Sequence, residues 1–349
     1  MKLSILNLVP IRQGSHYQEA VLQMKRLAQK AEQEGYERYW IAEHHNTTTF
    51  ASSATQLLIQ EALSATEHIR VGSGGVMLPN HSPYLVAEQY GTLDSLYPNR
   101  LDLGLGRAPG TDRETARALR RSPIDNTHQF DEDIRELRSY FEGTASVHAY
   151  PAEGREVPFY VLGSSTDSAF LAAKLGLPYA FAAHFAPNMM EEAISIYRLR
   201  FQPSKYCQRP YVILGANVIM ADNPDLAAHL ATSQVQLFVD IVTDKQMGLR
   251  PPVEDEETVW RQLMAIKGVP HFGPVAFSGG SFIHQERKLV ERMSGLSLIG
   301  DKETITKQLL DLKRTVPIDE LMAVTYIYDE QAQHRSVELL AEVIKENRL

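Results

Sequence analysis

The chain has 349 residues, of which 44% are hydrophobic and 22% charged, and its net charge at pH 7 is -8. This composition is typical of an ordinary soluble globule, and the acidic balance provides no basic surface for nucleic acid or an anionic membrane. The sequence contains no run of ~18 apolar residues, so no membrane span is predicted. Because Cys207 is the only cysteine, neither an internal disulfide nor a thiolate metal cluster can form, and we expect a cytoplasmic protein.

Short apolar runs alternate along the chain with segments in which apolar residues recur at helical spacing. The run 3–9 stops at Pro10, for example, and helical periodicity follows over 17–31. The predicted strands are 3–9, 36–42, 69–78, 101–106, 157–163, 179–183, 211–220 and 321–328. The predicted helices are 17–31, 54–65, 82–96, 131–141, 167–175, 189–200 and 335–345. Signals of helix ends support several of these helices, such as Ser82 directly before Pro83.

Alternating strands and helices favour a parallel sheet, and eight such units in about 350 residues favour closure into a (β/α)8 TIM barrel. An open doubly wound sheet is the main alternative. We expect a single domain, 1–349, with insertions after strand 4 and between strands 7 and 8. The second insertion, about 245–297, is rich in glycine and proline, and it is either a mobile lid or a solvated connector.

The active site of such a barrel forms at the carboxyl ends of the strands, because all eight strands point to that rim. The candidate residues at these ends are Glu43, His44 and His45 after the second strand, Gly74 and Gly75 in the third, Arg107 after the fourth, Gly163, Ser164 and Ser165 at the end of the fifth, and His184 after the sixth. We therefore expect them to surround one mouth of the barrel.

Two neighbouring segments predict a binding site for phosphate. Arg107 follows the glycine-containing segment 104–106, where the backbone can approach a ligand while the guanidinium binds an anion. Ser164 and Ser165 precede a predicted helix, whose free N–H groups and dipole favour an anion. The plainer readings are a surface ion pair for the arginine and an ordinary helix cap for the serines.

Residues 43–45 admit two kinds of chemistry, metal binding and proton transfer. Neighbouring residues of an extended segment point to opposite sides, so His44 and His45 cannot easily share one ion, and we expect no metal. A histidine acting as a general base fits better, because imidazole titrates near neutral pH, although a structural histidine is the alternative. Gly74 and Gly75 indicate either a simple kink or a place where a flat ligand contacts the backbone.

Four segments of the sequence resemble the successive signatures of the bacterial luciferase family of flavin-dependent monooxygenases. They are YWIAEHHN at 39–46, GSGGVMLPN at 72–80, LYPNRLDLGLGR at 96–107, and GSS at 163–165, which leads into AAKLGLP at 172–178. Their order and spacing hold over about residues 1–220. At Gly106, the light-emitting members carry a cysteine beside the flavin, and this departure puts light emission and a long-chain aldehyde substrate in doubt.

The resemblance implies a barrel that binds reduced FMN, supplied by a separate flavin reductase, with the flavin ring over the third strand. It makes His44 the catalytic base and Gly74–Gly75 a non-prolyl cis peptide. The cofactor-binding residues that it implies are Gly74, Gly75, Arg107, Gly163, Ser164, Ser165 and Ser168, with the phosphate between the loops after the fourth and fifth strands.

The implied reaction uses O2 through a flavin C4a-hydroperoxide, which oxidises a small organic, aldehyde-like substrate. The implied assembly is a homodimer. The family also contains deazaflavin-dependent hydride-transfer enzymes and flavin-binding relatives without evident catalysis, and both remain alternatives.

Overall fold

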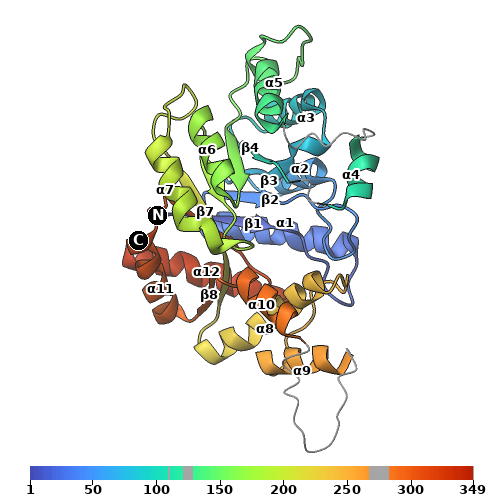
Figure 1. The fold of residues 1–349 in the computed structure, drawn as a ribbon, viewed down its shortest axis with the longest axis vertical. Coiled ribbons are helices and arrows are strands. Elements are labelled where there is room, and N and C mark those ends of the chain that lie inside the picture. Colours follow the sequence, from blue (N-terminus) through green and yellow to red (C-terminus); the bar gives the residue numbers. More distant parts are fainter. Residues whose placement is uncertain (109–110, 121–128, 267–282, 349) are drawn as a thin grey trace, which may run out of the picture.

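The computed structural model describes residues 1–108, 111–120, 129–266 and 283–348. Within these ranges, eight parallel strands close into a ring that helices surround (Figure 1). The strands follow one another as β1, β2, β3, β4, β5, β6, β7 and β9, and β9 pairs with β1 again. The pairing of β6 with β7, at Tyr179 with Val212, completes the ring. The predicted (β/α)8 barrel is confirmed, and the open sheet is excluded.

The strands of the ring are buried over most of their length, as expected where helices cover a barrel from outside. Their bounds are β1 (Lys2–Asn7), β2 (Arg38–Ile41), β3 (Arg70–Met77), β4 (Leu101–Gly106), β5 (Phe159–Gly163), β6 (Tyr179–Phe181), β7 (Val212–Met220) and β9 (Glu320–Val324). A further strand, β8 (Ser297–Gly300), pairs with the second half of β7, beyond the end of β6. The sequence pattern does not predict β8.

The helices form the outer layer of the barrel (Figure 1). Their bounds are α1 (Tyr17–Gln33), α2 (Thr55–Ala65), α3 (Pro83–Leu96), α4 (Arg113–Arg120), α5 (Phe130–Glu142), α6 (Thr166–Leu175), α7 (Met190–Arg200), α8 (Pro224–Val242), α9 (Glu256–Ile266), α10 (His284–Met293), α11 (Lys302–Thr315) and α12 (Glu330–Asn347). The insertion after β4 contains α4 and α5. A single turn of 3-10 helix, Leu78–Asn80, follows β3, and another, Pro187–Met189, precedes α7.

Two long helices, α8 and α11, are missing from the sequence-based prediction, although each begins with a recognisable cap. The side chain of Asn223 accepts a hydrogen bond from the backbone N–H of Leu226, and Pro224 occupies the first turn of α8. The carboxylate of Asp301 accepts from the N–H of Thr304 at the start of α11. Most of α8 is buried on several sides, so its pattern lacks the single apolar stripe that identifies a surface helix.

The insertion predicted at about 245–297 is built partly from regular structure. It contains α9 and α10, both of which pack against α8 at the lower side of the barrel in Figure 1. Residues 267–282 of this insertion lie outside the described residues. The proposed lid therefore stays a prediction for the segment that connects the two helices.

A network of buried charges fills the barrel at the amino-terminal ends of its strands. Arg38 donates hydrogen bonds to Glu320 (2.7 Å) and Asp102 (2.8 Å), and Trp40 donates from Nε1 to Asp102 (3.1 Å). Burial lowers the pKa of Arg38, but the two carboxylates outweigh this effect and hold its pKa above the usual value. Since Trp40 also lines the cavity described below, this network forms the floor of the site.

Candidate active site

A cavity of about 610 Å³ opens at the carboxyl ends of the strands. The eight residues to which the resemblance assigns a catalytic or cofactor-binding role line it, namely His44, Gly74, Gly75, Arg107, Gly163, Ser164, Ser165 and Ser168. They come from the ends of β2, β3, β4 and β5 and from the first turn of α6. These residues therefore converge on one mouth of the barrel as predicted, and His184 lines the same cavity, whereas Glu43 and His45, which the sequence also predicts there, are not among the residues that line it.

The imidazole of His44 stands in the wall of this cavity, just after β2. Burial lowers its pKa to about 4; the nearby Glu43 carboxylate opposes this shift and His45 adds to it. Its Nδ1 atom is buried without a hydrogen-bond partner in the described part of the chain. A neutral imidazole with an unused ring nitrogen beside a cavity is able to accept a proton from a bound ligand.

Glu43 links the ends of β2 and β3 through its hydrogen bonds. Its Oε1 atom accepts hydrogen bonds from Nε2 of His45 (2.9 Å) and of His81 (2.7 Å), and its Oε2 accepts from the N–H of Met77 (3.2 Å). Burial raises the pKa of Glu43, but the two imidazole donors outweigh this and lower it to about 2.

The potential ligand atoms of Glu43, His45 and His81 lie within 4.8 Å of one another, and such a donor set suits a first-row metal ion. In this structure, the three side chains satisfy one another, because both imidazoles donate to the same carboxylate oxygen. Position along the chain draws attention to His44 and His45 but not to His81, which only the fold brings next to Glu43.

Gly74 and Gly75 are joined by a cis peptide bond, as the resemblance implies. The pairing of β3 with β4 is irregular at this point, between Ser73 and Val76. A side chain at Gly74 would place its Cβ 2.4 Å from Leu6 Cδ1, and one at Gly75 would place it 2.9 Å from the carbonyl oxygen of Gly104. The contact at Gly75 is with backbone, which cannot move aside, whereas the contact at Gly74 is with the end of a flexible side chain, so packing requires glycine more strictly at position 75.

Gly106 stands where the light-emitting relatives carry a cysteine, and little free space surrounds it. A Cβ there would lie 2.9 Å from the Sδ atom of Met77, which itself lines the cavity. Met77 thus occupies part of the space that a longer side chain at position 106 would need.

One side of the cavity combines a cation with a helix N-terminus. The Arg107 side chain is 47% exposed, and its partner among the described residues is Asp167, at 3.7 Å and 74% exposed. So long and exposed an ion pair contributes little, and it leaves the guanidinium free to bind an anion. Ser165 caps α6 and leaves first-turn N–H groups that also favour an anion.

The serine hydroxyls at the N-terminus of α6 differ in whether they already form hydrogen bonds with the protein. The hydroxyl of Ser168 donates to the carbonyl oxygen of Ser165 (2.7 Å) and bonds to the hydroxyl of Tyr179 (2.9 Å). Ser168 is therefore engaged mainly with the protein, in agreement with the plainer reading of these serines as helix caps. Ser164 makes no side-chain hydrogen bond within the described residues, so its hydroxyl is free for a ligand.

The other side of the cavity is apolar and comes from elements that the sequence did not connect to the site. Its members are Leu6, Leu8, Phe50, Phe185, Ile213, Phe238, Ile241, Met293, Met322 and Tyr326. Phe238 and Met293 belong to α8 and α10, and no local sequence signal marks them because only the tertiary fold places them here.

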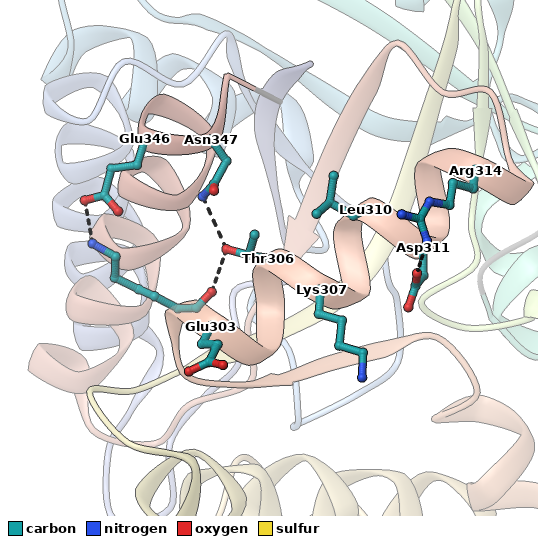
Figure 2. Close-up of a pocket in the computed structure, with 9 residues that line it drawn as sticks. Glu303, Thr306, Lys307, Leu310, Asp311, Arg314, Glu346 and Asn347 are labelled. Carbon is teal, nitrogen blue, oxygen red and sulfur yellow. Dashed lines mark hydrogen bonds and ion pairs between the residues drawn. The ribbon is translucent and has the colours of Figure 1, made fainter.

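A second hollow lies on the outer layer, between α11 and α12, and Figure 2 shows its side chains. Four of its charged side chains are paired, Lys302 with Glu346 at 2.5 Å and Arg314 with Asp311 at 3.1 Å, whereas Glu303 and Lys307 form no ion pair within the described residues. Asn347 and Thr306 are joined by a hydrogen bond of 3.3 Å. All the residues that line this hollow belong to α11 and α12, so it lies away from the strand ends.

Among the described helices, none combines the length and the apolar character that crossing a bilayer requires.

Comparison with known proteins gives one consistent family. The model of the family described as "Luciferase-like monooxygenase" matches residues 1–317. The chain is 43% identical over 348 residues to the uncharacterized protein YddN of Bacillus subtilis (strain 168), covering 99% of this chain and 96% of that one. It is 41% identical over 346 residues to a luciferase-like monooxygenase of Escherichia coli (strain K12), covering 98% and 97%.

Solved structures agree with this assignment. The structure of apo-MsnO8 superposes with a TM-score of 0.84 at 29% identity, covering 99% of this chain and 98% of that one. At 16% identity, the same fold occurs in the FMN complex of the oxygenating constituent of 3,6-diketocamphane monooxygenase from Pseudomonas putida (TM-score 0.68, covering 98% and 97%). It also occurs in an F420-dependent secondary alcohol dehydrogenase (TM-score 0.64, covering 99% and 98%). The chain belongs to the luciferase-like monooxygenase family and is a flavin-dependent oxidoreductase.

Proposed function

We propose that this protein is an FMN-dependent monooxygenase that uses reduced flavin and O2 to oxidise a small organic, aldehyde-like substrate. The observation that carries the proposal is the shape of the cavity. Arg107, whose ion pair is long and exposed, and the N-terminus of α6 lie on one side. The paired glycines form one wall, and the neutral His44 faces an apolar pocket.

The residues on the polar side suit the phosphate of FMN. Arg107 offers a fork of donors, Ser164 a free hydroxyl, and the start of α6 its first-turn amides, and such groups stabilise a dianion together. Gly74 and Gly75 line the cavity and carry no side chains of their own, so an aromatic ring can approach their backbone closely. The apolar side chains beyond would then surround the substrate and exclude water.

When bound, reduced FMN supplies two electrons through its C4a carbon, so that one atom of O2 enters the substrate and the other leaves as water. His44 would accept and return the proton that this exchange requires, because its pKa of about 4 keeps it neutral at physiological pH. The Trp40–Asp102 floor and the apolar wall would keep solvent away from the reacting atoms.

The proposal includes a separate flavin reductase as the source of reduced FMN, a homodimeric assembly and a cytoplasmic location. The single cysteine, Cys207, is compatible with a reducing compartment. The same fold binds FMN in one distant relative and F420 in another, so the choice of FMN over a deazaflavin rests on the family resemblance and on the test below.

Rapid mixing with O2 separates the proposed function from its alternatives. Protein loaded with reduced FMN should form an oxygen adduct that decays slowly without substrate, and product should contain one atom from labelled O2. Immediate decay with tight binding of a deazaflavin would instead favour hydride transfer. Tight FMN binding without any consumption of O2 would favour a non-catalytic flavin carrier.

A further inference from the structure

His184 enters the cavity from the side that faces His44. It follows β6 directly, whereas His44 follows β2, and these two strands are four positions apart in a ring of eight. Strands so spaced lie across the barrel from each other. Both imidazoles line the same cavity, so whatever occupies the mouth between them lies between two histidines.

Strand β7 holds His184 in place from two sides. A Cβ at Gly215 would sit 2.6 Å from Nδ1 of His184 and 3.2 Å from Cε1, so the imidazole rests directly on the backbone of this glycine. Two residues further along, the amide of Asn217 donates a hydrogen bond of 2.9 Å to the carbonyl oxygen of His184. The backbone and the ring are therefore both fixed, which pre-organises the side chain for a ligand.

The imidazole of His184 is not used by the protein in the way that a structural histidine is. Buried polar atoms of side chains normally have hydrogen-bond partners. The Nδ1 atom of His184 lies beside the Gly215 backbone without a well-formed hydrogen bond, and no described side chain pairs with the ring. Burial lowers its pKa to about 4, His44 adds to this effect, and the Gly215 backbone opposes it, so the ring is neutral at physiological pH.

The groups around His184 are apolar. Phe181, Phe185, Ile213 and Met293 share this part of the cavity, and the guanidinium of Arg107 belongs to the side assigned to the cofactor phosphate. An anionic substrate would therefore lose its hydration without gaining a counter-charge from the described residues, which is costly. An uncharged molecule with one hydrogen-bonding atom would fit the two neutral imidazoles and the apolar wall.

We propose that His184 is a second functional residue of the site, which hydrogen-bonds to an uncharged substrate held between His184 and His44. This inference rests on the proposed function, since it assumes that FMN occupies the polar side of the cavity. It assigns to His184 the recognition of the substrate heteroatom, such as the oxygen of an aldehyde, and leaves proton transfer to His44.

The test uses full-length protein saturated with oxidised FMN, titrated with octanal and, separately, with octanoate, while the visible absorbance of the flavin is followed. These probes share a carbon chain and differ in charge. We expect octanal to bind at least tenfold more tightly than octanoate. His184→Phe should weaken octanal binding about tenfold, the effect of losing one hydrogen bond, and should leave FMN affinity unchanged.

Two further variants complete the design. His184→Gln keeps a hydrogen-bonding side chain of similar reach and should bind octanal within about threefold of the wild type. His148→Phe serves as the matched control, because His148 is an exposed histidine outside the cavity, and it should bind both ligands normally.

The proposal is overturned if His184→Phe binds octanal as the wild type does, if it loses FMN affinity in parallel, or if octanoate binds as tightly as octanal. It is also overturned if FMN-saturated wild type shows no response to octanal. Failure of the wild type to bind FMN at all is a different result, which contradicts the proposed function.

Discussion

At the scale of single residues, the site separates the tasks of proton transfer and anion binding between the two sides of one cavity. His44 stands neutral in a wall that offers its Nδ1 no partner among the described residues. Arg107 stands on the other side with only a distant carboxylate beside it. The two residues can therefore be tested independently of each other.

We predict that His44→Ala lowers the rate of substrate oxidation by about 10²–10⁴-fold, the usual contribution of a general base, with FMN affinity maintained. Steady-state turnover with a flavin reductase, alongside FMN titration, measures both effects. His148→Ala, an exposed histidine, is the control. Turnover of His44→Ala within threefold of the wild type would remove the base assignment.

Removing the guanidinium of Arg107 should weaken FMN binding by about 10–100-fold, because a hydrogen bond to a charged group contributes about 1.5–3 kcal/mol. Arg107→Ala is compared with Arg314→Ala, whose side chain is 76% exposed on the surface of α11. The dissociation constant is read from quenching of FMN fluorescence. Equal affinity of both variants for FMN would place the phosphate elsewhere.

At the scale of elements, local sequence signals predict the strand ends well and the far side of the cavity poorly. The segments after β2, β3, β4 and β5 carry their own chemistry in adjacent residues, so the sequence alone brings them to one rim once a barrel is assumed. Phe238 on α8 and Met293 on α10 reach the same cavity only through packing. Nothing in their neighbouring residues distinguishes them from other buried apolar side chains.

The missed elements have a related cause. Helix α8 is buried on several sides and shows no single stripe, and β8 is four residues long and attaches to a strand that already has two other partners. The importance of His81 also follows from contact rather than from spacing, since 38 positions separate it from Glu43. Proximity along the chain therefore does not predict this pair.

The charged floor links β2, β4 and β9, so its loss should destabilise the whole barrel. Arg38→Met removes the cation that is paired with buried Glu320 and leaves Asp102 with Arg70 alone, which should lower the free energy of unfolding by about 3–5 kcal/mol. Urea denaturation followed by circular dichroism measures this change. Arg314→Met, the exposed control, should stay within about 0.5 kcal/mol of the wild type, and a similar result for Arg38→Met would refute the structural role.

At the scale of the whole molecule, the two buried histidines couple folding to pH. Burial lowers the pKa of His44 and of His184 from 6.5 to about 4, so the unfolded chain binds protons in this range that the folded chain does not. Their stabilising contribution is present above pH 6.5 and is lost as the pH falls towards 4.

We therefore predict that the free energy of unfolding decreases between pH 7.5 and pH 5, and that this decrease becomes smaller in His184→Phe. Urea unfolding at several pH values measures the slope, with His148→Phe as the control. An unchanged slope in His184→Phe would show that its imidazole titrates normally in the folded protein.

Exposed apolar side chains on adjacent helices support the proposed homodimer. Leu57 on α2 is 65% exposed and Leu85 on α3 is 53% exposed, and these helices pack side by side. We predict the mass of a dimer by light scattering, and a shift towards monomer in the double variant Leu57→Glu/Leu85→Glu. Leu199→Glu is the control on α7, where Leu199 is 79% exposed; dissociation in this variant alone would assign the interface to another face.

The account as a whole depends on where the cofactor lies, and a crystal structure of the protein with bound FMN tests this most directly. We predict the phosphate between Arg107 and the first turn of α6, the flavin ring on the Gly74–Gly75 peptide, and His44 and His184 on either side of the remaining space. Density for FMN outside this cavity, or with its phosphate on the apolar side, would contradict the proposed site and the reaction built on it.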